Sequence, residues 1–234
     1  MGYFLANSWL ALLLAILCGY LLGSVNWAII VTRFFSRKDI REEGSGNAGA
    51  TNVLRAHGKL PAALTAVGDI GKSVLAALLG GWLLTHLHLA QPDAVMMPDW
   101  AGNNLWLIGG YFGGFSGIIG HVLPLFYGFR GGKGVLTTLG MFLVLDWRVA
   151  LTCLAIFIVI VVISRMVSLG SVLAIGCGAP LLLVFGLWLD QRSLLEVVFT
   201  VVFAVLVETV IVVKHKDNIK RILAGTERRL GQKA

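Results

Sequence analysis

The chain has 234 residues, of which 57% are hydrophobic and 13% are charged, and its mean hydropathy is +0.85. Soluble domains carry about 25% charged residues, so this composition excludes an ordinary soluble protein and predicts a polytopic membrane protein. The formal net charge of +7 is typical of basic cytoplasmic loops in such a protein, and we assign it no nucleic-acid partner.

Continuous apolar runs predict an all-α integral membrane fold of about seven transmembrane helices. The first run is interpreted as a retained helix, because it lacks the basic start and cleavage site of a signal peptide. The fourth run is too short to cross a bilayer alone. An alternative is therefore five spans, with the fourth and fifth helices forming a re-entrant hairpin. The predicted helices cover residues 9–31, 61–84, 105–125, 135–145, 149–163, 169–189 and 194–213.

The second predicted helix carries Asp69 and Lys72, which share one face because they are three residues apart. A charge inside a membrane is costly and normally faces the protein interior or a water-filled cavity. Both a self-neutralising structural ion pair and a wall of the active cavity remain open. Three cysteines, Cys18, Cys153 and Cys177, lie in apolar runs without metal-ligand spacing, so we predict buried thiols and no metal.

The polar loop after the first helix, residues 33–59, contains a glycine-rich segment. Its glycines let the backbone approach a ligand closely, and successive backbone N–H groups can bind an anion. Arg55 adds a planar fork suited to phosphate. The alternative is a flexible linker, but linkers are usually longer and richer in serine. The segment reads Gly44-Ser45-Gly46-Asn47-Ala48-Gly49-Ala50-Thr51-Asn52-Val53-Leu54-Arg55.

Two further polar segments carry cations. Residues 128–134 contain Gly131-Gly132-Lys133-Gly134, which lacks the spacing and the Ser or Thr of a Walker A loop. Residues 214–227 form a basic tail with His215, Asn218 and Arg221. Because the first segment is also glycine-rich and basic, the two glycine-rich loops could share one phosphorylated ligand, and the donors of all three segments suit one or two phosphate groups.

The distribution of basic residues predicts the topology. All 19 Lys and Arg residues except Lys72, Arg148 and Arg192 fall in the loops and tail on the side that holds the three segments. Because Lys and Arg accumulate in cytoplasmic loops, we predict an outside N-terminus, a cytoplasmic C-terminus and a cytoplasmic site. Residues 1–234 are expected to form a single membrane-embedded domain.

The three segments resemble the signatures of the acyl-phosphate:glycerol-3-phosphate acyltransferases, the PlsY family. The resemblance covers nearly the whole chain and includes Asp69, Lys72, His121 and the segment 167–171. The matching patterns are Gly44-Ser45-Gly46-Asn47-x-Gly49-Ala50-Thr51-Asn52-x-x-Arg55, Gly131-Gly132-Lys133-Gly134 and His215-x-x-Asn218-Ile219-x-Arg221-x-x-x-Gly225-x-Glu227.

The resemblance implies a bacterial inner-membrane enzyme that is monomeric, uses no cofactor and has its site on the cytoplasmic face. Its partners are acyl phosphate, glycerol 3-phosphate and membrane lipid. It transfers the acyl group to the 1-hydroxyl, giving lysophosphatidic acid and phosphate, the first step of phospholipid biosynthesis.

The resemblance also suggests residue roles. The loop 44–49 is expected to hold acyl phosphate, and the cations of the site are expected to hold glycerol 3-phosphate. Catalytic roles are assigned to Ser45, Arg55, Lys133, His215 and Asn218. Substrate-binding roles are assigned to Gly44, Gly46, Asn47, Gly49, Thr51, Asn52, Gly131, Gly132, Gly134, Ser171 and Glu227.

Two roles differ between mechanisms. The attacking hydroxyl can lose its proton to the donor phosphate, in which case His215 orients substrate, or His215 can act as the base. Glu227 has no evident proton to take from a surface tail, and we expect it to tie the third segment to a basic neighbour such as Arg55 or Lys133.

Two other classes of protein compete with an enzyme. A small anion transporter fits basic loops and an intramembrane Asp/Lys pair, but it predicts internal symmetry. The Gly-Ser-Gly-Asn segment has no counterpart in the second half of the chain. A structural subunit that binds lipid head groups does not explain why donors recur in three separate segments.

Overall fold

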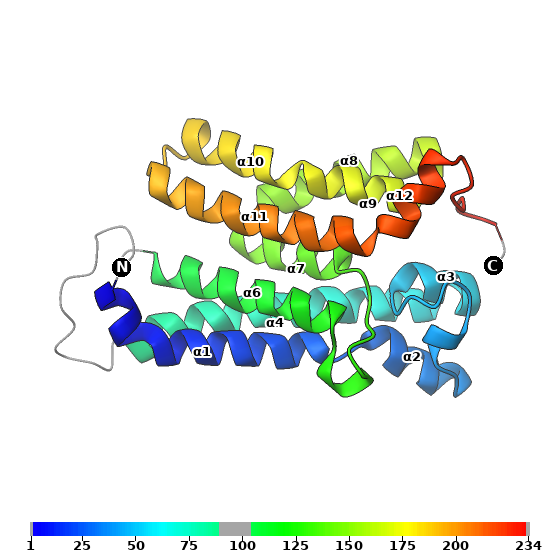
Figure 1. Cartoon of the computed structure of the whole chain (residues 1–234), viewed down its shortest axis with the longest axis horizontal. Coiled ribbons are helices and arrows are strands. Elements are labelled where there is room, and N and C mark those ends of the chain that lie inside the picture. Colours follow the sequence, from blue (N-terminus) through cyan, green and yellow to red (C-terminus); the bar gives the residue numbers. More distant parts are fainter. Residues whose placement is uncertain (1, 89–103, 233–234) are drawn as a thin grey trace.

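The computed structural model describes residues 2–88 and 104–232, and within these ranges it is helical without strands (Figure 1). Long apolar runs become helices because a helix satisfies its own backbone hydrogen bonds where lipid offers none. The predicted all-α class is confirmed. The helices are α1 (Gly2–Ser24), α2 (Trp27–Ser36), α3 (Ala50–His57), α4 (Lys59–His88), α6 (Leu105–Val122), α7 (Val135–Leu145), α8 (Trp147–Ser164), α9 (Val167–Gly176), α10 (Gly178–Val184), α11 (Leu194–Lys214) and α12 (Lys216–Leu223).

Six helical stretches in the described residues are long and apolar enough to cross a membrane. The polytopic prediction is thereby confirmed, whereas α7, with 11 residues, rises only about 16 Å and falls short of a bilayer core of roughly 30 Å. The candidate spans are Ser8–Ser36, Lys59–Leu87, Leu105–Tyr127, Trp147–Ser164, Val167–Leu189 and Leu194–Lys214.

Two of the predicted helices are interrupted, so the prediction that each is continuous was wrong. The first breaks between α1 and α2, where Asn26 Oδ1 accepts from the N–H of Ile29 at 3.2 Å and caps α2. The stretch 167–189 breaks at Cys177, and there Glu208 Oε1 accepts from the N–H of Ala179 at 2.9 Å. Each break leaves backbone groups without helical partners, and a polar side chain satisfies one of them.

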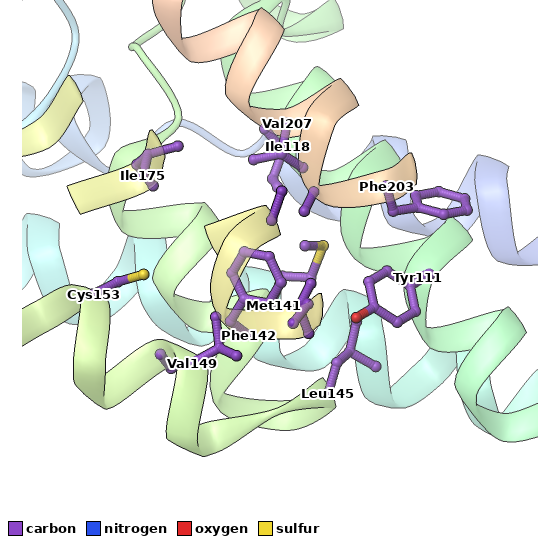
Figure 2. Packing of buried hydrophobic residues seen from close by; sticks show 14 of the residues in the cluster. Tyr111, Ile118, Met141, Phe142, Leu145, Val149, Cys153, Ile175, Phe203 and Val207 are labelled. Atoms are coloured by element: carbon purple, nitrogen blue, oxygen red, sulfur yellow. The ribbon is translucent and has the colours of Figure 1, made fainter. Parts of the chain in front are cut away.

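The bundle has two layers joined by α7 (Figure 1). In one layer α1, α4 and α6 pack closely, because a side chain at Gly23 or Gly80 would collide with the backbone of α6. The glycines of α6 thus form a smooth face against α1 and α4. In the other layer lie α8 to α11, and α7 packs between the layers. Figure 2 shows Met141 and Phe142 of α7 lying between Tyr111, Phe203 and Val149 in the largest buried apolar cluster.

Ion pairs place the turn between α7 and α8 beside the turn that precedes α11. Arg148 Nη2 lies 2.6 Å from Asp190 Oδ2, and Arg192 Nη2 lies 3.4 Å from Asp146 Oδ2. The segments α7 and α8 therefore run between the same two ends of the bundle as α9–α10 and α11. The end occupied by α3 and α12 lies opposite the N-terminus (Figure 1). Most of the predicted loop 86–104 lies outside the described residues.

Candidate active site

The first glycine-rich segment is anchored by Asp39 and Arg41. The Asp39 carboxylate accepts from Arg41 Nε at 3.0 Å, from Arg41 Nη2 at 2.9 Å and from Arg33 Nη2 at 2.9 Å. The hydrogen bond from Arg41, aided by Arg33, lowers the pKa of Asp39 to about 2. Arg41 Nη1 also donates to the carbonyl of Tyr127 at 2.7 Å. This guanidinium therefore ties the first loop to the start of the second.

Asn52 holds the first loop from within. It is buried, and its Nδ2 donates to the carbonyls of Ile40, Glu43 and Asn47 at 3.1, 3.0 and 3.1 Å. Its Oδ1 accepts from the N–H of Ser45 at 3.0 Å. The sequence predicts a substrate contact for Asn52, whereas in the structure its side-chain amide is hydrogen-bonded to the loop backbone. Its role in the fold is to set the loop's shape.

The same loop ends at the N-terminus of α3. Gly44 and Gly46 have φ of 60° and 69°, a left-handed conformation that favours glycine. Gly49 is the N-cap residue of α3, and Thr51 lies in the first turn. The exposed Ser45 therefore sits beside a helix N-terminus, where backbone N–H groups and the helix dipole favour an anion.

The second loop packs against the first. The N–H of Gly132 donates to the carbonyl of His121 at 3.1 Å. A Cβ at Gly132 would lie 2.6 Å from the carbonyl oxygen of Ala48 and would collide with the His121 ring. Glycine is therefore required where the two loops meet. Gly134, with φ of 95°, ends the loop and precedes α7.

The third segment reaches the second loop through Asn218. Lys133 Nζ donates to Asn218 Oδ1, and Asn218 Nδ2 donates to Glu227 Oε1 at 2.6 Å. Glu227 also accepts from Ser168 Oγ and, at 2.8 Å, from Arg221 Nε. Burial opposes ionisation of Glu227, but the hydrogen bonds from Ser168, Asn218 and Arg221 outweigh it and lower the pKa of Glu227. The basic partner of Glu227 is thus Arg221, in place of the predicted Arg55 or Lys133.

His215 lies between α11 and α12 and is buried. Its Nδ1 lies 2.8 Å from the carbonyl oxygen of Ile211, so Nδ1 carries the proton and donates to that oxygen. Nε2 is left as an acceptor in the neutral ring. Burial, with the nearby charge of Lys133, lowers the pKa of His215 to about 4. The ring is therefore neutral at physiological pH.

Arg55 and Lys133 are two partly buried cations at this end that have no carboxylate of the described residues within ion-pair distance. The buried Nε of Arg55 has no hydrogen-bond partner. Burial and the nearby charge of Arg228 lower the pKa of the Arg55 guanidinium. Burial, with repulsion from Arg221 and Arg55, lowers the pKa of Lys133 to about 8. Two close cations with spare donors form a site for a phosphate dianion.

Ser171 does not join this cluster through its hydroxyl, which donates to the carbonyl of Val167 at 2.9 Å. Ser168, one turn earlier on α9, is the serine that contacts Glu227. Our residue assignments omitted Ser168 and Arg41. Ser168 could have been predicted from its spacing to Ser171, because residues three apart lie on one face of a helix. Nothing in the sequence around Arg41 indicates that it ties the first loop to the second.

The fold and this cluster define a multi-pass integral membrane protein with a cationic site at one end of its bundle. The family model described as glycerol-3-phosphate acyltransferase matches residues 13–225. The chain belongs to this family, whose activity is acyl transfer to glycerol 3-phosphate. The glycerol-3-phosphate acyltransferase of Clostridioides difficile strain 630 is 39% identical over 214 residues, covering 92% of this chain and 93% of the relative. That of Rippkaea orientalis is 40% identical over 220 residues, covering 94% and 93%.

Solved structures of similar fold agree with this assignment. One is PlsY, an integral membrane glycerol 3-phosphate acyltransferase, in its glycerol 3-phosphate form. It matches with a TM-score of 0.74 and 29% identity, covering 94% of this chain and 96% of PlsY. The lysophosphatidic acid form of PlsY matches with a TM-score of 0.71 and 28% identity, covering 94% and 95%. The predicted family is therefore confirmed.

Proposed function

We propose that this chain transfers a fatty acyl group from acyl phosphate to the 1-hydroxyl of glycerol 3-phosphate. The products are lysophosphatidic acid and inorganic phosphate, and the reaction is the first step of phospholipid biosynthesis. The observation that carries the proposal is a pair of cations without a carboxylate partner in the described chain, Arg55 on α3 and Lys133 on the second loop, which lie close enough for their charges to repel. The excess of Lys and Arg in these loops supports a cytoplasmic site in the bacterial inner membrane.

The two loops suit two different phosphates. The loop 44–49, with Ser45 and the N-terminus of α3, offers the backbone donors that fit the phosphate of the acyl donor. Arg55, Lys133 and Asn218 then hold the phosphate of glycerol 3-phosphate, with Glu227 fixing the Asn218 amide through its hydrogen bond at 2.6 Å. Relatives named glycerol-3-phosphate acyltransferase support this acceptor.

The reaction needs positioning more than acid–base chemistry. Acyl phosphate is a mixed anhydride with a good leaving group. The acceptor oxygen attacks the acyl carbon, the bond from that carbon to the phosphate oxygen breaks, and the hydroxyl proton leaves on the departing phosphate. Holding two anions in reach of each other can lower the barrier by several kcal/mol, on the order of the entropy of bringing two reactants together. A pKa near 4 makes His215 a weak base, so we assign its Nε2 the role of orienting the acceptor hydroxyl.

An apolar cavity of about 80 Å³ begins close to the second loop and suits the first part of the acyl chain. It is lined from α7, α8 and α9, beginning near Val135, two residues after Lys133, and reaching Cys153. Its two hydroxyl residues, Thr138 and Ser171, both donate to carbonyls of their own backbone, at 2.9 Å each. The walls therefore resemble lipid, which suits an alkyl chain.

A donor comparison tests the proposal. The purified protein is given labelled glycerol 3-phosphate with palmitoyl phosphate, palmitoyl-CoA or a palmitoyl thioester of a carrier protein, and lysophosphatidic acid and phosphate are measured. We expect product only with palmitoyl phosphate, at one phosphate per lysophosphatidic acid. Equal use of a thioester donor, or acceptor-independent release of phosphate alone, contradicts the proposed donor.

A further inference from the structure

Three buried polar side chains inside the bundle have no role in the site described above. Asp69 and Lys72 lie on α4 and His121 lies on α6, and they are 1%, 5% and 4% exposed. Lys72 Nζ lies 2.9 Å from Asp69 Oδ1, donates to the carbonyl of Val25 at 2.7 Å and lies 3.0 Å from His121 Nδ1. These contacts join α4, α6 and the break between α1 and α2 in one network.

The contacts around Lys72 assign the protons. An ammonium can only donate and Lys72 Nζ lies 3.0 Å from His121 Nδ1, so Nδ1 accepts and the proton of the neutral ring is on Nε2. The carbonyl of Val25 is free for Lys72 because the N–H of Ile29, its helical partner, is capped by Asn26. At the break in the first span, the N–H of Ile29 and the carbonyl of Val25 therefore each have a side-chain hydrogen-bond partner.

His121 connects this network to the second glycine-rich loop at the point where that loop faces the first. Its carbonyl accepts from the N–H of Gly132 at 3.1 Å. Its ring Nε2 occupies the space that a Cβ of Gly132 would take, and the carbonyl oxygen of Ala48 lies 2.6 Å from the same point. The ring therefore lies directly under the junction of loop 44–49 and loop 131–134.

We propose that Asp69, Lys72 and His121 are positioning residues for the acyl transfer, because they hold the two phosphate-binding loops at a fixed distance from each other. The kinetic part of this inference rests on the proposed function. An isolated buried ion pair is a weak source of stability and can often be replaced by apolar residues. This pair instead holds a third side chain that lies against Gly132, where the second loop faces Ala48 of the first, and loop separation sets the distance between donor and acceptor.

The test uses two variants of the full chain in detergent. Asp69→Asn/Lys72→Met removes both charges together, so that no uncompensated charge remains buried. His121→Asn keeps an acceptor for Lys72 near the Nδ1 position but no longer reaches Gly132. The matched control is Ser73→Ala, because Ser73 is a buried neighbour on α4 whose hydroxyl has no partner.

Hydrogen exchange measured by mass spectrometry reports how firmly the two loops are held, and it does not depend on enzyme activity. We expect faster exchange in peptides that cover residues 44–55 and 125–134 in both variants, unchanged exchange in α11, and no change in Ser73→Ala. We also expect kcat with palmitoyl phosphate to fall at least about tenfold, the scale expected for misplaced reactants. KM for glycerol 3-phosphate should change less, because Arg55 and Lys133 remain.

Three results overturn the inference. They are wild-type exchange in both loops, wild-type kcat in His121→Asn, or faster exchange throughout the bundle, which would make the network a general fold element. If the double variant does not fold, His121→Asn decides alone. A wild-type protein that is inactive with palmitoyl phosphate contradicts the proposed function, while the exchange data still decide whether the network holds the loops.

Discussion

The two ends of the bundle differ in how their charged side chains are paired. At the end where α7 meets α8, Arg148 and Arg192 are paired with Asp146, Asp190 and Glu196 at 2.6 to 3.5 Å. Hydrogen bonds from Arg148 and the nearby Arg192 lower the pKa of Asp190 to about 2. These charges neutralise one another and clamp two turns together. They leave little attraction for a ligand.

At the opposite end the charges do not cancel. The carboxylate that contacts Asn218, Glu227, is engaged by Arg221, Asn218 and Ser168. Within the described ranges Arg55 and Lys133 are left without a carboxylate partner, although holding two cations close together is unfavourable and burial adds to the cost. An unbalanced charge of this kind is stabilised when an anion binds, so it marks the functional end.

The largest expected effect comes from removing either unpaired cation. Arg55→Ala and Lys133→Ala should each lower kcat/KM for glycerol 3-phosphate by at least about a hundredfold, as expected for loss of a charge aimed at a reacting phosphate. Lys38→Ala is the control, because Lys38 is an exposed cation paired with Glu43 at the same end. A loss of less than threefold in both site variants would remove them from the binding site.

A smaller effect is expected from Glu227→Gln. The amide keeps the size of the carboxylate but cannot pair with Arg221, so the Asn218 amide and through it Lys133 lose part of their support. We expect kcat/KM to fall about tenfold, the scale of one charge-assisted hydrogen bond. Steady-state assays on Glu227→Gln and on Glu42→Gln, an exposed surface control, measure it. Equal rates in the two variants would contradict a supporting role for Glu227.

The pH dependence should report Lys133. Burial lowers its pKa to about 8, so the ammonium that attracts phosphate is present below pH 8 and is lost as pH rises through that value. The plot of kcat/KM against pH should therefore fall above about pH 8. In Lys133→Arg the guanidinium stays charged, and the fall should move to higher pH. A fall at the same pH in both proteins would assign it to another group.

The smallest effect on activity is expected at the paired end. Arg192→Gln removes contacts to Asp146, Asp190 and Glu196. Arg192, Asp190 and Glu196 are partly exposed, and such exposed pairs contribute about 0.2–1 kcal/mol each. The melting temperature should fall by a few degrees while kcat/KM stays at the wild-type value. A large loss of activity without loss of stability would show that the far end also takes part in the reaction.

The sequence was sufficient for the apolar helices and for the three polar segments, because helix length and residue type are local properties. It did not reveal the break at Asn26, since an apolar run with one asparagine resembles a continuous span. It also did not reveal that Asn52 holds its own loop or that Glu227 pairs with Arg221. Those partners depend on how the loops fold back, and several donors of the right chemistry were available for each acceptor.

The most direct test compares glycerol 3-phosphate binding at the two ends. Isothermal titration of the detergent-solubilised protein measures Kd for the wild type, for Arg55→Ala/Lys133→Ala and for Arg148→Gln/Arg192→Gln. We predict that the first pair of substitutions abolishes measurable binding and that the second leaves Kd unchanged. Wild-type affinity in Arg55→Ala/Lys133→Ala would contradict the central claim that the unpaired cations form the phosphate site.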